Sequence, residues 1–134
     1  MAIQKESHAV AVAQAHVEAW ADQDFETARS ALANDVTVTI ESTSDALPPT
    51  NISGIDEYMK GLEAFAGGVV PGSLAVHASL GDERNALLLT SVEAAFGPDG
   101  TKVTLPAARL YLLDDDRKIK ADRVVVYMAP SNST

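Results

Sequence analysis

The chain has 134 residues, of which 46% are hydrophobic and 22% charged, an ordinary globular composition. This length predicts a single domain spanning residues 1–134 around one hydrophobic core. Ten Lys and Arg against nineteen Asp and Glu give a net charge of −9, which disfavours nucleic acid and anionic membranes as partners. The chain has no cysteine, which excludes disulfides and thiolate chemistry. No apolar run reaches bilayer length and the N-terminus lacks a secretory signal, so we expect a cytoplasmic protein.

Two helices are expected in the N-terminal third of the chain. Apolar side chains recur at helical spacing between residues 3 and 21. Asp24 is suited to cap a second helix over residues 25–33. His16 lies inside the apolar stripe of the first helix, where a polar side chain is unusual and suggests a specific role.

The rest of the pattern is mostly that of strands. Residues 36–42 (VTVTIES) alternate apolar and polar side chains, as a strand with one buried face does. The turn-rich segment 42–53 is expected to be a loop, and Ser53 with Asp56 resembles a capping box for a helix over residues 54–66. Short turns, which favour antiparallel pairing, separate four further strands. These are expected at residues 73–80, 85–96, 102–113 and 117–128.

This order of elements resembles the nuclear transport factor 2-like superfamily, which includes ketosteroid isomerases, limonene epoxide hydrolase and SnoaL-like polyketide cyclases. The segments that carry the resemblance are EAWADQDFETARSALANDVTVTIES (18–42), SGIDEYMKGLEAF (53–65) and ARLYLLDDDRKIKADRVV (108–125). The resemblance implies an α+β fold, in which a cone-shaped, curved antiparallel sheet wraps around three helices of the N-terminal half (a cystatin-like α+β barrel). It also implies an apolar pocket in the cone, a hydrophobic small-molecule ligand and a homodimer.

The catalytic residues of the ketosteroid isomerases are not retained under this resemblance. His16 takes the place of their oxyanion-binding tyrosine, Ile40 that of their aspartate base and Ala108 that of their protonated acid. We therefore do not expect that activity. The arginine between two aspartates that is typical of the epoxide hydrolases is not evident either, because the expected strand phase directs Arg109 away from Ala108 and Leu110.

Three titratable residues are candidates for an acid-base set. A neutral His16 in the pocket could move protons near pH 7, and a core histidine bonded to a backbone carbonyl is an equally good interpretation. Asp122 shares a strand face with Val124, where apolar surroundings raise a carboxyl pKa; a solvated strand-end carboxylate is the alternative. Glu93 joins the set only if its face of residues 85–96 points inward.

The expected pocket walls are apolar and aromatic. The predicted wall residues are Trp20, Ile40, Tyr58, Met59, Leu62, Ala108, Leu110 and Val124. The opposite sheet face, with Arg109, Tyr111, Arg123 and Tyr127, is expected to be a homodimer interface or a solvated surface. Neither a metal-binding motif nor a Gly-rich phosphate loop is present, so we expect no metal and no cofactor.

Three functions remain compatible with the sequence. The first is an acid-base enzyme of the polyketide cyclase, isomerase or hydratase kind, acting on a hydrophobic carbonyl-containing ligand in a cone-shaped pocket. The second is a non-catalytic ligand-binding dimer, which the missing isomerase residues favour. The third is a protein-interaction module. We adopt the first as the working hypothesis.

Overall fold

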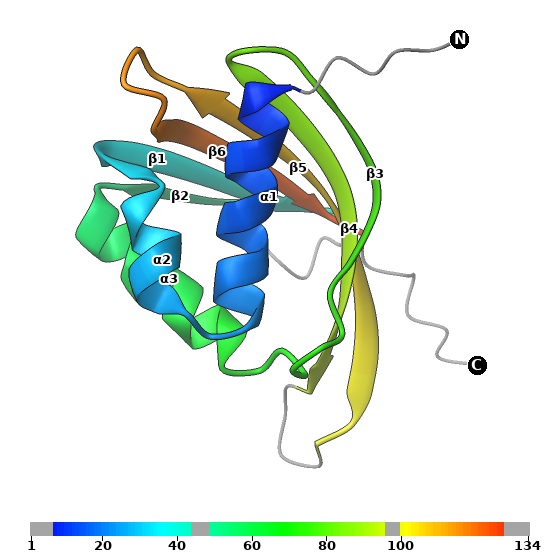
Figure 1. Ribbon diagram of the computed structural model, residues 1–134. Helices are drawn as coiled ribbons and strands as arrows, with labels where there is room; N and C mark the ends of the chain where they lie inside the picture. Colours follow the sequence, from blue (N-terminus) through cyan, green and yellow to red (C-terminus); the bar gives the residue numbers. More distant parts are fainter. Residues whose placement is uncertain (1–6, 44–48, 96–99, 128–134) are drawn as a thin grey trace, which may run out of the picture.

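The computed structural model describes residues 7–43, 49–95 and 100–127. Three helices lie against one face of a six-stranded sheet that curves around them without closing, which is the expected α+β architecture (Figure 1). The helices are α1 (His8–Ala21), α2 (Phe25–Ser30) and α3 (Ile55–Ala66). The strands are β1 (Leu32–Ser42), β2 (Thr50–Ser53), β3 (Ala75–Gly81), β4 (Asn85–Ala95), β5 (Lys102–Leu113) and β6 (Ile119–Val126).

The last strand lies in the middle of the sheet, whose order is β2-β1-β6-β5-β4-β3. β6 pairs with β5 antiparallel and with β1 parallel. The short turns predicted antiparallel pairing correctly for β3, β4, β5 and β6. The parallel pair joins two strands that lie far apart in the sequence, so no local turn indicates it. β2 at the sheet edge was also missed, because it lies in the turn-rich segment 42–53 that was expected to be a loop.

The helix boundaries follow their caps. The Asp24 carboxylate accepts from the Thr27 amide at 3.2 Å, which confirms the predicted cap of α2. α2 is shorter than predicted, since Leu32 already belongs to β1. The predicted capping box before α3 is wrong: Gly54, at φ 93°, takes the N-cap position and no side chain bonds there. The predicted outer ends of one helix (residues 3–6) and two strands (96 and 128) lie outside the described residues.

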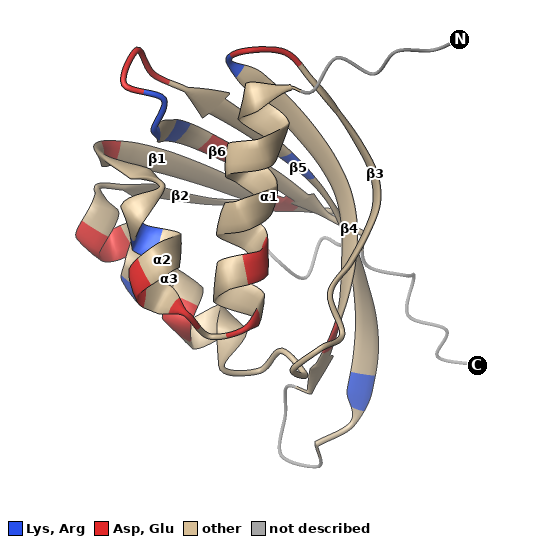
Figure 2. Ribbon diagram, viewed as in Figure 1, with Lys and Arg blue, Asp and Glu red and all other residues tan. Residues whose placement is uncertain are grey.

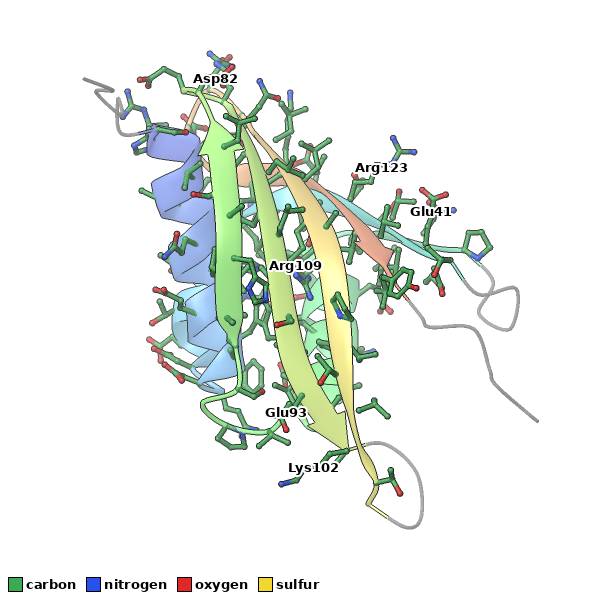
Figure 3. The ribbon with its side chains drawn as sticks, turned by 90° about the vertical axis from the view of Figure 1, so that its right-hand side faces the viewer. Glu41, Asp82, Glu93, Lys102, Arg109 and Arg123 are labelled. Carbon is green, nitrogen blue, oxygen red and sulfur yellow. The ribbon has the colours of Figure 1, made fainter. Side chains whose placement is uncertain are left out.

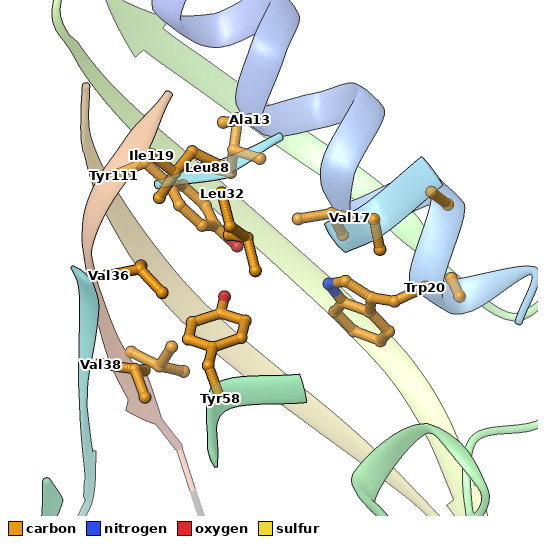
Figure 4. Packing of buried hydrophobic residues seen from close by; sticks show 14 of the residues in the cluster. Ala13, Val17, Trp20, Leu32, Val36, Val38, Tyr58, Leu88, Tyr111 and Ile119 are labelled. Atoms are coloured by element: carbon orange, nitrogen blue, oxygen red, sulfur yellow. The ribbon is translucent and has the colours of Figure 1, made fainter. Parts of the chain in front are cut away.

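One hydrophobic core fills the space between the helices and the sheet (Figure 4). Its largest fully buried side chains include Trp20, Leu88, Tyr111, Leu113 and Ile119. Burying an aliphatic or aromatic side chain of this size stabilises the fold by about 1.5–3 kcal/mol. The core therefore holds the helices against the sheet and fixes the position of every side chain that points inward.

Charged residues lie mainly on the helices and in the turns (Figure 2). The ion pair of Arg29 with Asp56, at 2.7 Å, joins α2 to α3 at the surface. Exposed pairs of this kind contribute at most about 1 kcal/mol each. Within the described ranges, no helix combines the length and apolar character that crossing a membrane requires.

Candidate active site

Five buried polar side chains come together between the helices and the centre of the sheet. They are His16 on α1, Tyr58 on α3, Arg109 and Tyr111 on β5, and Asp122 on β6. Each is at most 7% exposed. Buried polar groups are costly unless they are paired, so their gathering in one place needs a chemical reason.

Three of these side chains form a hydrogen-bonded chain. His16 Nδ1 lies 2.9 Å from the Ala28 carbonyl oxygen, and His16 Nε2 lies 3.2 Å from the Tyr58 hydroxyl. The Tyr58 hydroxyl in turn lies 2.5 Å from Asp122 Oδ2. A carbonyl oxygen only accepts, so Nδ1 carries a hydrogen and, in the neutral ring, Nε2 is an acceptor. The histidine in the apolar stripe of α1 is therefore both bonded to a backbone carbonyl and connected to the carboxyl group on β6.

The hydrogens of this chain can be counted. Tyr58 has one hydroxyl hydrogen, which cannot serve a neutral His16 Nε2 and an ionised Asp122 at once. A proton on Asp122 solves this, because the acid then donates to Tyr58 and Tyr58 donates to His16. A doubly protonated His16 with an ionised Asp122 also satisfies every bond. Both hydrogen bonds of Tyr58 are therefore satisfied only when His16 and Asp122 together carry one additional proton, compared with a neutral His16 and an ionised Asp122.

Burial shifts the pKa values of these groups in opposite directions. Burial raises the Asp122 pKa from 3.8 to about 6, against the lowering effects of Arg109 and of the Tyr58 hydrogen bond. Burial lowers the His16 pKa from 6.5 to about 4, in spite of the bond to Ala28 and with a further lowering by Arg109. The shared proton therefore belongs mainly to Asp122, and it is lost near pH 6.

Two atoms of the cluster lack a partner in the described part of the chain. Asp122 Oδ1 and the Tyr111 hydroxyl are both fully buried and make no hydrogen bond there. Tyr111 and Asp122 are direct partners in the β5–β6 register, so their side chains are neighbours on the inner face. The hydroxyls of Tyr58 and Tyr111 point toward one another (Figure 4). An unpaired buried polar group costs about 1–3 kcal/mol, which a ligand or a water would relieve.

Arg109 is held in the cluster by two contacts. Its Nε donates to Thr90 Oγ1 at 3.2 Å, and its guanidinium carbon lies 5.0 Å from the centre of the Trp20 ring. Trp20 is packed edge-on against Phe65. None of the ion pairs between described residues includes Arg109. The cluster thus contains a permanent positive charge that no carboxylate neutralises at close range.

The predicted phase of residues 102–113 is therefore wrong. Arg109 and Tyr111, expected on the outer face, point inward, and Leu110, expected in the pocket wall, is 44% exposed. Ala108 lies on the outer side with it and is half-buried. β5 itself alternates regularly, with Arg109, Tyr111 and Leu113 buried. The wrong phase arose because β5 carries apolar side chains on both faces, so alternation does not identify the inner one.

Glu93 also lies on the outer side of the sheet, exposed and opposite Thr104 of β5 (Figure 3). It cannot join His16 and Asp122, so the predicted set of three loses this member. The missed members of the cluster are Arg109 and Tyr111. The alternation of β5 gives no signal for them, because this strand is apolar on both faces. The remaining predicted wall residues are buried or half-buried: Trp20, Tyr58, Met59 and Val124 are buried, and Ile40 and Leu62 are half-buried.

Two surface hollows lie apart from the cluster, between α1 and β3. One, of about 480 Å³, is lined by Glu18, Asp22 and Leu74 among others. The other, of about 750 Å³, lies toward the start of α1 near Leu80. Neither is lined by a member of the cluster, so we place the candidate chemistry at the buried titratable groups rather than in these hollows. The described ranges contain no group of three or more His, Asp or Glu side chains able to hold a metal ion.

A family model described as a SnoaL-like domain matches residues 13–121. The chain belongs to this SnoaL-like family. The match covers α1 to the beginning of β6 and so includes four of the five cluster residues, all but Asp122. No curated protein matches the sequence.

Solved structures share the fold of this SnoaL-like chain. A protein from Kribbella flavida is 26% identical, with a TM-score of 0.72 over 90% of this chain and 88% of its own. An epoxide hydrolase of Mycobacterium tuberculosis, described as LEH-like, is 21% identical, with a TM-score of 0.68 over 89% and 82%. RV0760c of the same organism, solved with estradiol-17β-hemisuccinate, is 14% identical, with a TM-score of 0.73 over 89% and 93%. The last two likenesses show the fold alone.

Proposed function

We propose that this SnoaL-like protein is a cofactor-independent acid-base enzyme that acts on a hydrophobic carbonyl compound, with Asp122 as the group that moves the proton. The observation that carries the proposal is the buried Asp122 carboxyl group, which has one oxygen bonded to Tyr58 and the other without a partner. A pKa of about 6 lets this carboxyl group take and return a proton near neutral pH.

The neighbours of Asp122 supply the other half of such a reaction. Removing a proton next to a carbonyl group leaves an oxyanion, which hydrogen-bond donors in a dry site stabilise. Tyr111 has an unpartnered hydroxyl beside Asp122, and Arg109 brings a positive charge on the same face of β5. His16, with its pKa lowered to about 4, acts through Tyr58 as a neutral hydrogen-bond acceptor rather than as the base.

The relatives support a hydrophobic ligand of this kind. One neighbour in the fold carries a steroid ester and another is described as an epoxide hydrolase. Hydration of an epoxide is the second candidate, favoured by the buried Arg109 near Asp122. The cluster holds one aspartate rather than two, and Tyr111 stands beside Asp122, so we rank proton transfer at a carbonyl compound first.

Hydrogen exchange next to a carbonyl group tests the proposal directly. Steroid and aromatic polyketide ketones are incubated with the protein in D₂O, and deuterium uptake at the α-carbon is followed by NMR. We expect Asp122→Asn to slow uptake by about 10²–10⁴-fold, and the wild-type rate to rise with pH through about 6 as the carboxyl group ionises. Asp116→Asn, in an exposed turn, is the matched control.

A rate that is equal in wild type and Asp122→Asn sinks the assignment of this residue. If no ketone is exchanged while terpenoid epoxides are hydrated, the second candidate replaces the first. If neither occurs and the ligands still raise the melting temperature, the protein is a binding protein.

The proposal includes a homodimer, formed by the outer face of the sheet. Because Arg109 and Tyr111 point inward, the interface consists instead of exposed apolar side chains on β4, β5 and β6. They are Leu89, Leu110 and Val125, with Tyr127 beyond the end of β6. Leu89, Ala108 and Val125 are paired in one row across the three strands, which gives a continuous apolar surface rather than scattered residues.

A further inference from the structure

We propose that the buried cluster binds the carboxyl group of a hydrophobic carboxylic acid, which accepts from Arg109 and Tyr111 and shares a proton with Asp122. The inference concerns binding and uses the site of the proposed function, but it does not require turnover. A carboxylate carries the negative charge of the oxyanion that this site would stabilise, and its second oxygen provides a partner for Asp122.

The charge of Arg109 is the first argument. Arginine stays protonated, and a buried positive charge without an anion is unfavourable. Within the described ranges its side chain contacts Thr90 Oγ1 and the Trp20 ring and makes no ion pair. Its guanidinium group also lies near the Tyr111 hydroxyl and acts on Asp122 through its charge, without a hydrogen bond of good geometry to either group. A guanidinium group binds a carboxylate through two parallel hydrogen bonds, which uses donors that Thr90 and Trp20 leave available.

The two unpartnered atoms are the second argument. The Tyr111 hydroxyl is a donor for one ligand oxygen, and Asp122 Oδ1 is an acceptor. A ligand carboxylate next to an ionised Asp122 would place two negative charges side by side. In a site without water their repulsion is so unfavourable that one of the two groups binds a proton at neutral pH. One proton held between the ligand oxygen and Oδ1 removes the repulsion and satisfies Asp122 Oδ1. Binding therefore takes up a proton from the solvent.

The surroundings of Asp122 support this coupling from every packed element. Tyr58 faces it from α3, with His16 on α1 beyond, and Tyr111 and Arg109 face it from β5. Val38, its partner on β1, is aliphatic. Asp122 is thus the group among these neighbours that gains a proton near neutral pH, since burial keeps His16 neutral and the tyrosine pKa values are raised.

Calorimetry on the full chain tests the inference with octanoate and, as the matched neutral probe, octanamide. We expect octanoate to bind at least about tenfold more tightly than octanamide, since a charge-assisted bond to arginine is worth about 1.5–3 kcal/mol. The binding enthalpies measured in phosphate and in Tris should differ by the difference between the ionisation enthalpies of the two buffers, because about one proton is taken from the buffer for each octanoate bound. The Kd of octanoate should rise by up to about tenfold per pH unit above pH 6.

The variants Arg109→Gln and Arg123→Gln form a matched pair. Arg123 lies on the exposed side of β6 next to Glu41, away from Arg109 (Figure 3). We expect Arg109→Gln to remove the preference for octanoate over octanamide and Arg123→Gln to keep it. If Arg109→Gln does not fold, the buffer and pH dependence of the wild type decide alone.

The inference is overturned if octanoate does not bind, if octanamide binds equally well, or if binding takes up no proton. These outcomes leave the proposed function standing when ketone exchange still depends on Asp122. Conversely, octanoate binding with proton uptake but no exchange of any ketone overturns the proposed function alone.

Discussion

The Tyr58 hydroxyl lies 2.5 Å from Asp122 Oδ2, and so connects α3 with a strand 64 positions further along the chain. Bonds between a hydroxyl and a carboxylate are this short when the charge assists them. His16 Nε2, at 3.2 Å from the same hydroxyl, adds α1. Tyr58 is therefore the link through which the protonation of Asp122 depends on His16.

Tyr58→Phe removes this link. Asp122 Oδ2 then loses its hydrogen-bond donor, so its pKa should rise above about 6, and the buried oxygen should destabilise the fold by about 1–3 kcal/mol. NMR titration of the Asp122 carboxyl carbon and urea denaturation measure the two effects. Tyr127→Phe, at a side chain 51% exposed, should change stability by less than about 0.5 kcal/mol. An Asp122 titration that is the same in Tyr58→Phe and wild type contradicts the hydrogen-bonded chain.

The opposite pKa shifts of His16 and Asp122 should cancel in the pH dependence of stability. Between pH 6.5 and about 4, His16 is protonated in the unfolded protein but neutral in the folded protein. Its contribution therefore lowers the free energy of unfolding as the pH falls through this range. Between pH 3.8 and about 6, Asp122 is protonated in the folded protein but ionised in the unfolded protein. Its contribution therefore lowers the free energy of unfolding as the pH rises through this range. Between about pH 4 and 6 the two slopes are equal and opposite.

Asp122→Asn should expose the His16 contribution. The free energy of unfolding of the variant should increase with pH between about 4 and 6, by up to about 1.4 kcal/mol per pH unit relative to wild type, because the compensating Asp122 term is gone and the His16 slope remains. Urea denaturation at half-unit pH steps measures this difference, in which contributions from other groups cancel. Asp116→Asn should remain parallel to wild type. Parallel curves for Asp122→Asn would show that Asp122 does not titrate as described.

The outer sheet face should lose its self-association when a charge is placed at its centre. Leu110→Glu puts a carboxylate on a side chain that is 44% exposed and lies between β4 and β6. We expect wild type to run as a dimer and the variant as a monomer in size-exclusion chromatography with light scattering. Ala64→Glu, exposed on α3, adds the same charge on the helical side and should leave the dimer intact. A monomeric wild type excludes the interface.

Trp20 should support both the core and the position of Arg109. Trp20→Ala removes a ring that is 1% exposed, so we expect a loss of about 3–5 kcal/mol of stability. Trp20→Phe keeps an aromatic face for the guanidinium group and should lose less. Circular dichroism during denaturation compares the two. Because Trp20 is the one tryptophan of the sequence, a changed emission in Arg109→Gln checks the stacking in a folded protein; equal losses in the two Trp20 variants contradict it.

The sequence predicted correctly which side chains are buried in those helices and strands that have one clearly apolar face. The stripe of α1 placed His16 in the interior, and alternation in β6 placed Asp122 and Val124 on its buried side. Whether these residues act in catalysis stays a prediction. Strands β4 and β5 carry apolar side chains on both faces, so alternation alone does not say which face is inner.

The error in β5 has a specific physical origin. The strand alternates regularly, but Ala108, Leu110 and Leu112 on one side and Ala107 and Leu113 on the other are all apolar, so neither side stands out as the inner one. Arginine is usually exposed, and only the Trp20 face and Thr90 make an inner Arg109 acceptable. These contacts join residues far apart in the sequence, which a reading of local patterns does not reach.

The central position of β6 has a consequence for how the protein folds. Until this last strand is in place, the sheet consists of two separate parts, β1 with β2 and β3 to β5. Both partners of β6 expose an unpaired edge until then, and such edges promote aggregation. Asp122 lies on β6, so its contacts with Tyr58 and Tyr111 cannot form before this strand has been synthesised and has docked between β1 and β5. During synthesis, the core can begin to collapse before the ribosome has supplied the carboxyl group on which the chemistry depends.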